Sequence, residues 1–269
     1  MSAFLVFLNI ACSDYDFKEI QEGAPEADTG SQPVVDDSAT PSDPTDTGDS
    51  GADTAITEDP DIATEIIYLN SENQLFSWNP GEGKILVGTF SDSSVRMTDI
   101  AIDLDGRMYG IASTDLYRID AQTAEVTFQC TVDQYANGLT FISNGQLLAA
   151  GAGIFIIDLN TCLTTTVSNG DGFQTAGDVV GLPGERLFWT VNGSAGDGLV
   201  EVNPNTGEST LIGYLGISSL WGVGYADGLL YGFSSSGDAV VIDPETADVL
   251  AVENISGVWW GATTNPVRW

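Results

Sequence analysis

The stretch LYRID, residues 116–120, is one of five copies of a short pattern in which β-favouring residues end in Asp or Asn. The copies begin at residues 75, 116, 154, 199 and 239, in steps of 41, 38, 45 and 40 residues. They are LFSWNP (75–80), LYRID (116–120), IFIID (154–158), LVEVNP (199–204) and AVVIDP (239–244). Three copies end in Asn-Pro or Asp-Pro, which start turns. A repeat of about 40 residues predicts one supersecondary unit per copy.

Two further apolar stretches precede the copies, joined by short turns. The nearer stretch is IIYL (66–69), RMYG (107–110), QLLA (146–149), RLFW (186–189) and LLYG (229–232). The farther stretch is DIAI (99–102), GLTF (138–141), DVVG (178–181), GVGY (222–225) and GATT (261–264). After three copies, a turn leads into another apolar stretch, at 84–90, 209–213 and 249–252. Each repeat therefore reads as four short strands joined by tight turns.

Four strands per repeat of this length are typical of a propeller blade. We therefore predict an all-β fold, a five-bladed β-propeller of four-stranded blades over residues 63–269. The series opens at the second strand position, with 66–69, and finishes at the first, with 261–264. The last stretch is thus expected to pair with the first and close the ring, which leaves no free sheet edge there.

Composition excludes several kinds of chemistry. The chain has 39 acidic and 7 basic residues, no histidine and a net charge of −32. The lack of histidine excludes Ser-His-Asp and Cys-His catalysis and imidazole metal sites. The negative charge disfavours nucleic acids and anionic lipid headgroups as partners. Carboxylate chemistry and oxygen-ligated calcium remain.

The first residues read as an export signal. Residues 1–11, MSAFLVFLNIA, contain an apolar run that is too short to span a bilayer as a helix. Such a run is typical of the core of a signal peptide, and Cys12 follows it. Ile10-Ala11-Cys12 resembles the end of a bacterial lipoprotein signal peptide. The resemblance implies that 1–11 are removed and that Cys12 is lipidated. The protein would then be exported and anchored to the outer membrane through its lipid alone, facing the periplasm or the cell surface. A buried N-terminal strand is the alternative interpretation.

Residues 12–62 are predicted to be a disordered linker. They are rich in Asp, Thr, Ser, Pro and Gly and hold few large apolar side chains, so they bury too little surface to offset chain entropy. Like charges and prolines favour an extended chain. This acidic tether resembles those of lipoproteins from myxobacteria and their relatives.

The blade pattern has a family resemblance of its own. LYxID, followed by a turn and an apolar strand, then GLxF and DGxLYG, resembles the broad propeller superfamily of NHL-, YncE- and quinoprotein-like domains, over residues 63–269. The resemblance implies the fold. It does not imply one function, because propellers host unrelated activities.

Cys130 and Cys162 are the other two cysteines of the chain. In an exported protein two thiols are expected to pair, so we predict a disulfide that joins the outer strands of neighbouring blades. A free buried pair is the alternative.

The candidate binding site is the mouth of the central channel, where the innermost strands begin. If the stretch that opens each repeat is innermost, the mouth is lined by Thr98, Asp99, Asn137, Asp178, Trp221 and Trp260. This set favours a small polar or sugar-like ligand stacked on a tryptophan. Calcium between the two aspartates is a second interpretation. The third is structural, with the indoles packed between blades.

These observations predict a lipid-anchored, monomeric cell-envelope module that binds or scaffolds without catalysis. Its partner would be an envelope protein or a glycan, and no cofactor, metal or catalytic residue is assigned apart from the calcium alternative. Two other functions remain open. A lectin-like propeller needs exposed tryptophans at the channel mouth. A carboxylate-dependent glycoside hydrolase or lyase needs two acids that face one pocket.

Overall fold

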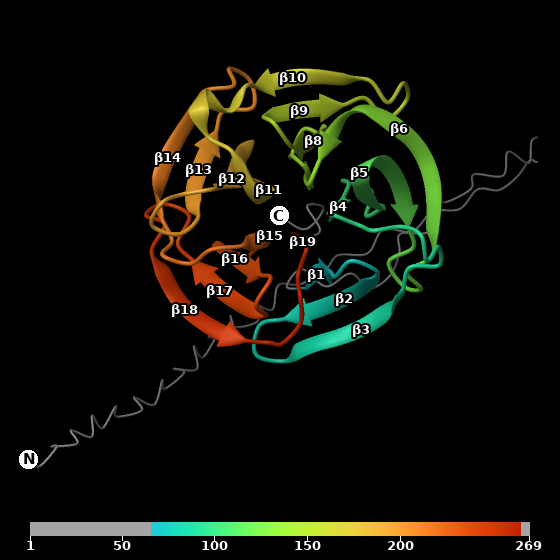
Figure 1. The fold of residues 1–269 in the computed structure, drawn as a ribbon, viewed down its shortest axis with the longest axis horizontal. Helices are drawn as coiled ribbons and strands as arrows, with labels where there is room; N and C mark the ends of the chain where they lie inside the picture. The colour runs from blue at the N-terminus through green and yellow to red at the C-terminus, as the bar shows by residue number, and fades with distance from the viewer. Residues whose placement is uncertain (1–65, 265–269) are drawn as a thin grey trace, which may run out of the picture. The chain divides into compact units, whose positions relative to one another are not determined.

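Five β-sheets are arranged as blades around a central axis (Figure 1). The computed structural model describes residues 66–264. The predicted five-bladed β-propeller is confirmed. The predicted export signal, the predicted lipid anchor at Cys12 and the predicted linker 12–62 lie outside the described residues. Within 66–264, no helix has the length and apolar character needed to cross a membrane.

Each blade runs from an innermost to an outermost strand. Blade 1 contains β19 (Gly261–Thr264), β1 (Ile67–Asn70), β2 (Gln74–Asn79) and β3 (Gly83–Thr89). Blade 2 contains β4 (Asp99–Ile102), β5 (Met108–Ile119) and β6 (Val126–Ala136). Blade 3 contains β7 (Gly138–Phe141), β8 (Leu147–Ala150), β9 (Ile154–Ile157) and β10 (Thr164–Ser168). Blade 4 contains β11 (Thr175–Leu182), β12 (Arg186–Val191), β13 (Gly198–Val202) and β14 (Ser209–Tyr214). Blade 5 contains β15 (Leu220–Ala226), β16 (Leu229–Ser234), β17 (Asp238–Ile242) and β18 (Val249–Asn254), and one 3-10 turn (Gly170–Gly172) links blades 3 and 4.

The ring closes as predicted, within blade 1. Strand β19 pairs antiparallel with β1, so that Ile67 lies opposite Thr264 and Asn70 opposite Gly261. Blade 1 therefore takes its innermost strand from the end of the described residues and its other three strands from their start. This pairing leaves neither strand with an open edge at the junction.

Blade 2 carries its two middle strands as one long strand. The first half of β5 pairs with β4, and its second half, from Ser113 onward, pairs with β6. Ser113 has a φ of 63°, so the backbone turns there without a separate loop.

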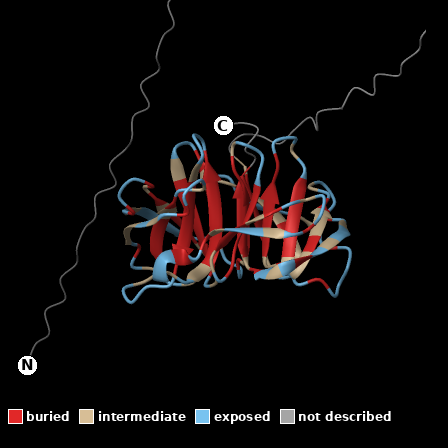
Figure 2. Cartoon of the chain, turned by 90° about the horizontal axis from the view of Figure 1, so that it is seen from above, coloured by how far each residue is buried: buried red, intermediate tan, exposed pale blue. Residues whose placement is uncertain are grey.

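The hydrophobic core lies between neighbouring blades. Strands β4, β7 and β19 are buried along their whole length, while β3 and β18 on the rim are mostly exposed (Figure 2). Aromatic side chains join adjacent blades: Trp78 of blade 1 packs edge-on against Tyr231 and Phe233 of blade 5. Apolar burial between sheets is thus what holds the ring together.

The Asp or Asn that ends each repeated pattern organises a turn. Asp120 Oδ1 accepts hydrogen bonds from the N–H groups of Gln122 and Thr123, and Asp158 Oδ1 does the same for Asn160 and Thr161. These hydrogen bonds stabilise the ionised form and lower the pKa of both carboxyl groups. Much of the acidity of the blades therefore comes from residues that shape turns.

The predicted disulfide is confirmed. Cys130 lies on β6, the outer strand of blade 2, and Cys162 lies in the turn after β9 of blade 3. Their Cα atoms are 6.4 Å apart. The bond therefore joins two blades at the rim.

Candidate ligand site at the channel mouth

The innermost strands present five equivalent backbone N–H groups to the channel. Strands β4, β7, β11, β15 and β19 lie side by side around the axis. Each of these strands is the innermost of its sheet, so the edge that faces the axis has no neighbouring strand in that sheet. The N–H groups on this edge therefore need other acceptors. At equivalent positions the five strands carry Asp99, Gly138, Asp178, Gly222 and Gly261, and the N–H groups that follow belong to Ile100, Leu139, Val179, Val223 and Ala262.

Asp99 provides acceptors for two of these five groups. Its Oδ1 accepts from the N–H of Ile100 at 2.7 Å, within its own strand. Its Oδ2 accepts from the N–H of Leu139 at 2.5 Å, on the next blade. Asp99 is fully buried, so both hydrogen bonds form away from water.

Asp178 provides acceptors for the other three. Its Oδ1 accepts from the N–H of Val179 at 2.6 Å and its Oδ2 from the N–H of Val223 at 2.6 Å. The N–H of Ala262 also donates to this carboxyl group. Asp178 is fully buried as well. Two aspartates thus satisfy one N–H group from each of the five blades.

The two carboxyl groups also hydrogen-bond to each other, and we call them the carboxylate pair. Such a bond requires a proton, since two ionised carboxylates only accept. Burial raises the pKa of Asp99 well above its usual range, and the charge of Asp178 raises it further. Burial also raises the pKa of Asp178, to about 7. We place the shared proton on Asp99, because Asp178 accepts more N–H groups.

Glycine at the intervening positions leaves room for the pair. A Cβ atom on Gly261 would lie 2.0 Å from Asp99 Oδ1, and one on Gly177 would lie 2.4 Å from the Cα of Trp221. Both distances are shorter than any non-bonded contact allows. Five converging strands therefore accept the two aspartates only because their neighbours lack side chains.

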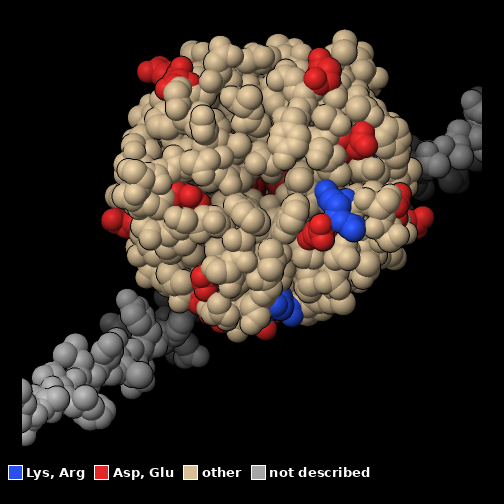
Figure 3. All heavy atoms as spheres, in the orientation of Figure 1, with Lys and Arg blue, Asp and Glu red and all other residues tan. Residues whose placement is uncertain are grey.

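Above the pair lies a small cavity, the channel-mouth pocket, with a volume of about 200 Å³. Seven residues line it: Thr98, Tyr135, Asn137, Ala176, Gly177, Trp221 and Trp260. The two indole rings are 6.1 Å apart between centroids and inclined at 78°. Both are half-buried. Figure 3 shows the hollow at the centre of one face, with acidic atoms at its bottom.

The structure brings the six predicted mouth residues together at two depths. Thr98, Asn137, Trp221 and Trp260 line the pocket, one from each of four blades. Asp99 and Asp178 lie one residue deeper and do not line it, because their oxygens are occupied by backbone N–H groups. Sequence reasoning missed Tyr135, which lies near the end of β6 where this strand approaches the centre. The sequence signal for the hydrogen-bonding role of the pair was that only Asp or Gly occupies the equivalent position of the five innermost strands.

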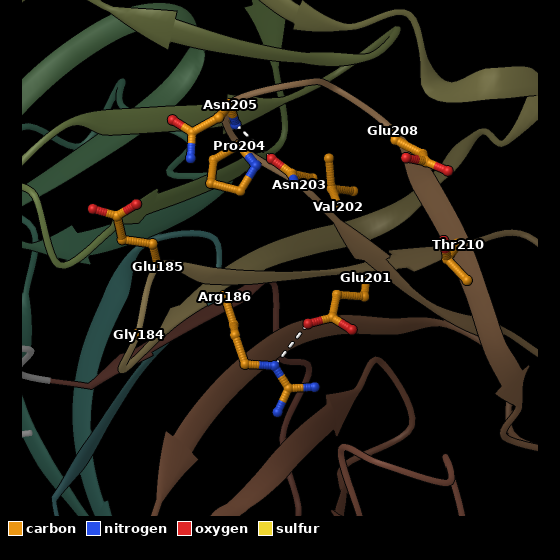
Figure 4. Close-up of a pocket in the computed structure, with 10 residues that line it drawn as sticks. All are labelled: Gly184, Glu185, Arg186, Glu201, Val202, Asn203, Pro204, Asn205, Glu208 and Thr210. Atoms are coloured by element: carbon orange, nitrogen blue, oxygen red, sulfur yellow. Dashed lines mark hydrogen bonds and ion pairs between the residues drawn. The ribbon is translucent and has the colours of Figure 1, made fainter.

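A larger pocket of about 470 Å³ lies on blade 4 (Figure 4). Its one basic residue, Arg186, donates to Glu201 at 2.7 Å and forms an ion pair with Glu245 of blade 5. These two carboxylates raise the pKa of the guanidinium. The positive charge is therefore already paired, and Arg186 links two blades rather than awaiting an anionic ligand.

Within residues 66–264 no group of three or more His, Cys, Asp or Glu is placed to hold a metal ion. The carboxylate pair supplies only four oxygens, and each already accepts at least one backbone N–H. The residues at the pair therefore do not fit a calcium site, which needs six or more oxygen ligands.

We expect the carboxylate pair to make stability fall as pH rises from about 5.5 to 8. In the unfolded chain both aspartates are ionised above about pH 5. The native pair retains protons in this window, and Asp178 loses its own near pH 7. The native state therefore binds more protons, so the free energy of unfolding decreases with pH. The chain has no histidine to obscure the effect. Urea unfolding across this range measures the slope.

Asp99→Asn is the control for that slope. The amide can donate to Asp178 and cannot ionise. It has one acceptor oxygen for the two N–H groups of Ile100 and Leu139, so the pH slope and not the absolute stability is the readout. The slope between pH 5.5 and 8 should become markedly shallower. An unchanged slope in this variant would place the titrating group elsewhere.

Comparisons with known proteins identify no family. No family model matches the sequence, and no curated protein matches it. Among solved structures, the chain is similar to U3-55K at 13% identity and a TM-score of 0.44, over 71% of this chain and 61% of that one. A structural genomics protein of unknown function from Bacteroides thetaiotaomicron is 10% identical, with a TM-score of 0.47, over 62% of this chain and 53% of that one.

A third structure comes from work on the de novo evolutionary emergence of a symmetrical protein. It is 16% identical, with a TM-score of 0.47, over 76% of this chain and 95% of that one. This chain spans 61% of the length of the U3-55K chain. At these identities the similarity concerns the fold alone, and the function is argued from the site.

Proposed function

We propose that this protein is a non-catalytic binding module whose ligand occupies the channel-mouth pocket. One observation carries the proposal: two half-buried indoles from neighbouring blades line a cavity at the centre of the ring. A concave, mostly aromatic site with a few polar groups is the usual form of a small-ligand pocket. Asn137 adds a buried Oδ1 that accepts no hydrogen bond from the described residues.

A hydrolase is the less favoured alternative. Acid–base catalysis would need carboxyl groups that reach a substrate within hydrogen-bond distance. The carboxylate pair is fully buried and its oxygens already accept backbone N–H groups. Binding without turnover is the function that this geometry supports.

Removing either indole should strongly weaken small-ligand binding. We expect compounds that bind the full chain, detected by ligand-observed NMR with a panel of neutral, cationic, anionic and sugar fragments, to lose at least about tenfold in affinity in Trp260→Ala and Trp221→Ala. Tyr214→Leu is the matched control, because Tyr214 is an exposed aromatic on β14 that lies outside the pocket. Hits that persist in both tryptophan variants would place the ligand elsewhere and contradict the proposal.

We further propose that the propeller is held at the cell envelope by a lipid on Cys12. The signal-like sequence 1–11 and the acidic stretch that follows support this placement. Cys12→Ser should move the protein from the membrane fraction to the soluble fraction and abolish labelling by a fatty-acid analogue. Ser13→Ala is the matched control. Membrane association that survives Cys12→Ser would refute the anchor.

A further inference from the structure

The walls of the channel-mouth pocket are largely aromatic, and two of its rings meet nearly at a right angle. The rings of Trp221 and Trp260 are inclined at 78°, so they do not form the flat platform on which a sugar ring stacks. Tyr135, which is 56% exposed, adds a third ring at the rim of the pocket. Aromatic faces carry partial negative charge and attract cations that lie against them.

The pocket has neutral polar groups but no basic side chain. Thr98 Oγ1 already donates to the carbonyl of Ile111 at 2.9 Å. Asn137 Oδ1 is buried and has no hydrogen-bond partner within residues 66–264. No Lys or Arg is among the seven lining residues. An anion is poorly matched, because the pocket offers it neutral donors from Asn137, Tyr135 and the two indoles but no positive charge.

The charge beneath the pocket has the same sign. Asp99 and Asp178 directly follow the lining residues Thr98 and Gly177 in the chain, about 3.3 Å further along their strands. Above about pH 7, where Asp178 has lost its proton and Asp99 keeps its own, the pair carries a single negative charge. This charge is poorly screened because no water reaches the two aspartates. Both the aromatic rings that line the pocket and the carboxylate charge beneath it therefore favour a positively charged ligand.

We propose that the channel-mouth pocket binds a compact organic cation of the methylated-ammonium class, held against Trp221 and Trp260 above the carboxylate pair. This inference rests on the proposed function and specifies its ligand class. A methylated ammonium group suits the site because it is positively charged, is largely apolar at its surface and needs few or no hydrogen bonds.

The test is calorimetric titration of the full chain at about pH 8 with three probes. These are choline, its neutral isostere dimethylbutanol, in which carbon replaces the nitrogen, and methyl glucoside. We expect choline to bind at least about tenfold more tightly than dimethylbutanol, and methyl glucoside not to bind. Trp260→Leu and Trp221→Leu, which keep apolar bulk, should each weaken choline binding at least about tenfold. Tyr214→Leu should bind choline as the parent does.

The other outcomes separate this inference from the proposed function. Equal binding of choline and dimethylbutanol, or binding of methyl glucoside alone, would overturn the cation class and leave a binding module. Choline binding that both tryptophan variants retain would place the cation outside the pocket and overturn the inference. If none of the three probes binds, the cation inference is overturned, and the broader fragment panel then decides on the proposed function. Circular dichroism confirms that each variant is folded.

Discussion

Asp178→Ala should lower the free energy of unfolding by at least about 3 kcal/mol. The substitution leaves the N–H groups of Val179, Val223 and Ala262 without an acceptor at the centre of the ring. Each buried polar group that loses its partner costs about 1–3 kcal/mol. It also leaves Asp99 without its partner. Urea unfolding at about pH 6 measures the loss.

Asp120→Ala is the matched control for Asp178→Ala. Asp120 also accepts from two backbone N–H groups, but it is exposed, so water replaces the carboxylate when it is removed. We expect a loss of about 1 kcal/mol or less there. If both variants lose the same small amount, the pair does not hold the innermost strands together.

Replacing Cys130 and Cys162 together by serine should lower the free energy of unfolding by about 3–4 kcal/mol. The bond joins residues that are 32 apart in the chain. In the loop-closure treatment, a bond across a loop of this length lowers the entropy of the unfolded chain and so raises its free energy by about 3–4 kcal/mol. Reduction of the parent protein by dithiothreitol should shift the urea midpoint as the double variant does. Dithiothreitol should leave the double variant unchanged. A loss below about 1 kcal/mol would show that rim packing alone holds blades 2 and 3 together.

The fold was predictable from the sequence because blade strands repeat in register. The positions of 66–69 and 261–264 within that register were enough to predict the pairing of β1 with β19. The single strand β5 was not predictable, because its turn at Ser113 lacks the glycine that lies between the second and third strands of blades 3, 4 and 5. A positive φ at serine is set by tertiary packing, which a local pattern does not encode.

The site was predictable in position and less so in chemistry. Convergence of the innermost strands predicts that Thr98, Asn137, Trp221 and Trp260 come together, and they line one pocket. Whether Asp99 and Asp178 face a ligand or the backbone depends on distances of a few tenths of an ångström between strands. Sequence patterns carry no such distances, so the hydrogen-bonding role of the pair emerged only from the structure.

The pairing of β1 with β19 also determines how the chain reaches its native state. Strand β1 is the first of the nineteen strands in residues 66–264, yet its inner partner β19 is the last of them. Contacts between such distant segments form slowly, because a large chain entropy is lost before they stabilise anything. The N–H groups of Val223 and Ala262 likewise find their common acceptor only when the ring is nearly complete. Folding should therefore be a late, all-or-none event, and a chain stopped before β19 should remain open at blade 1.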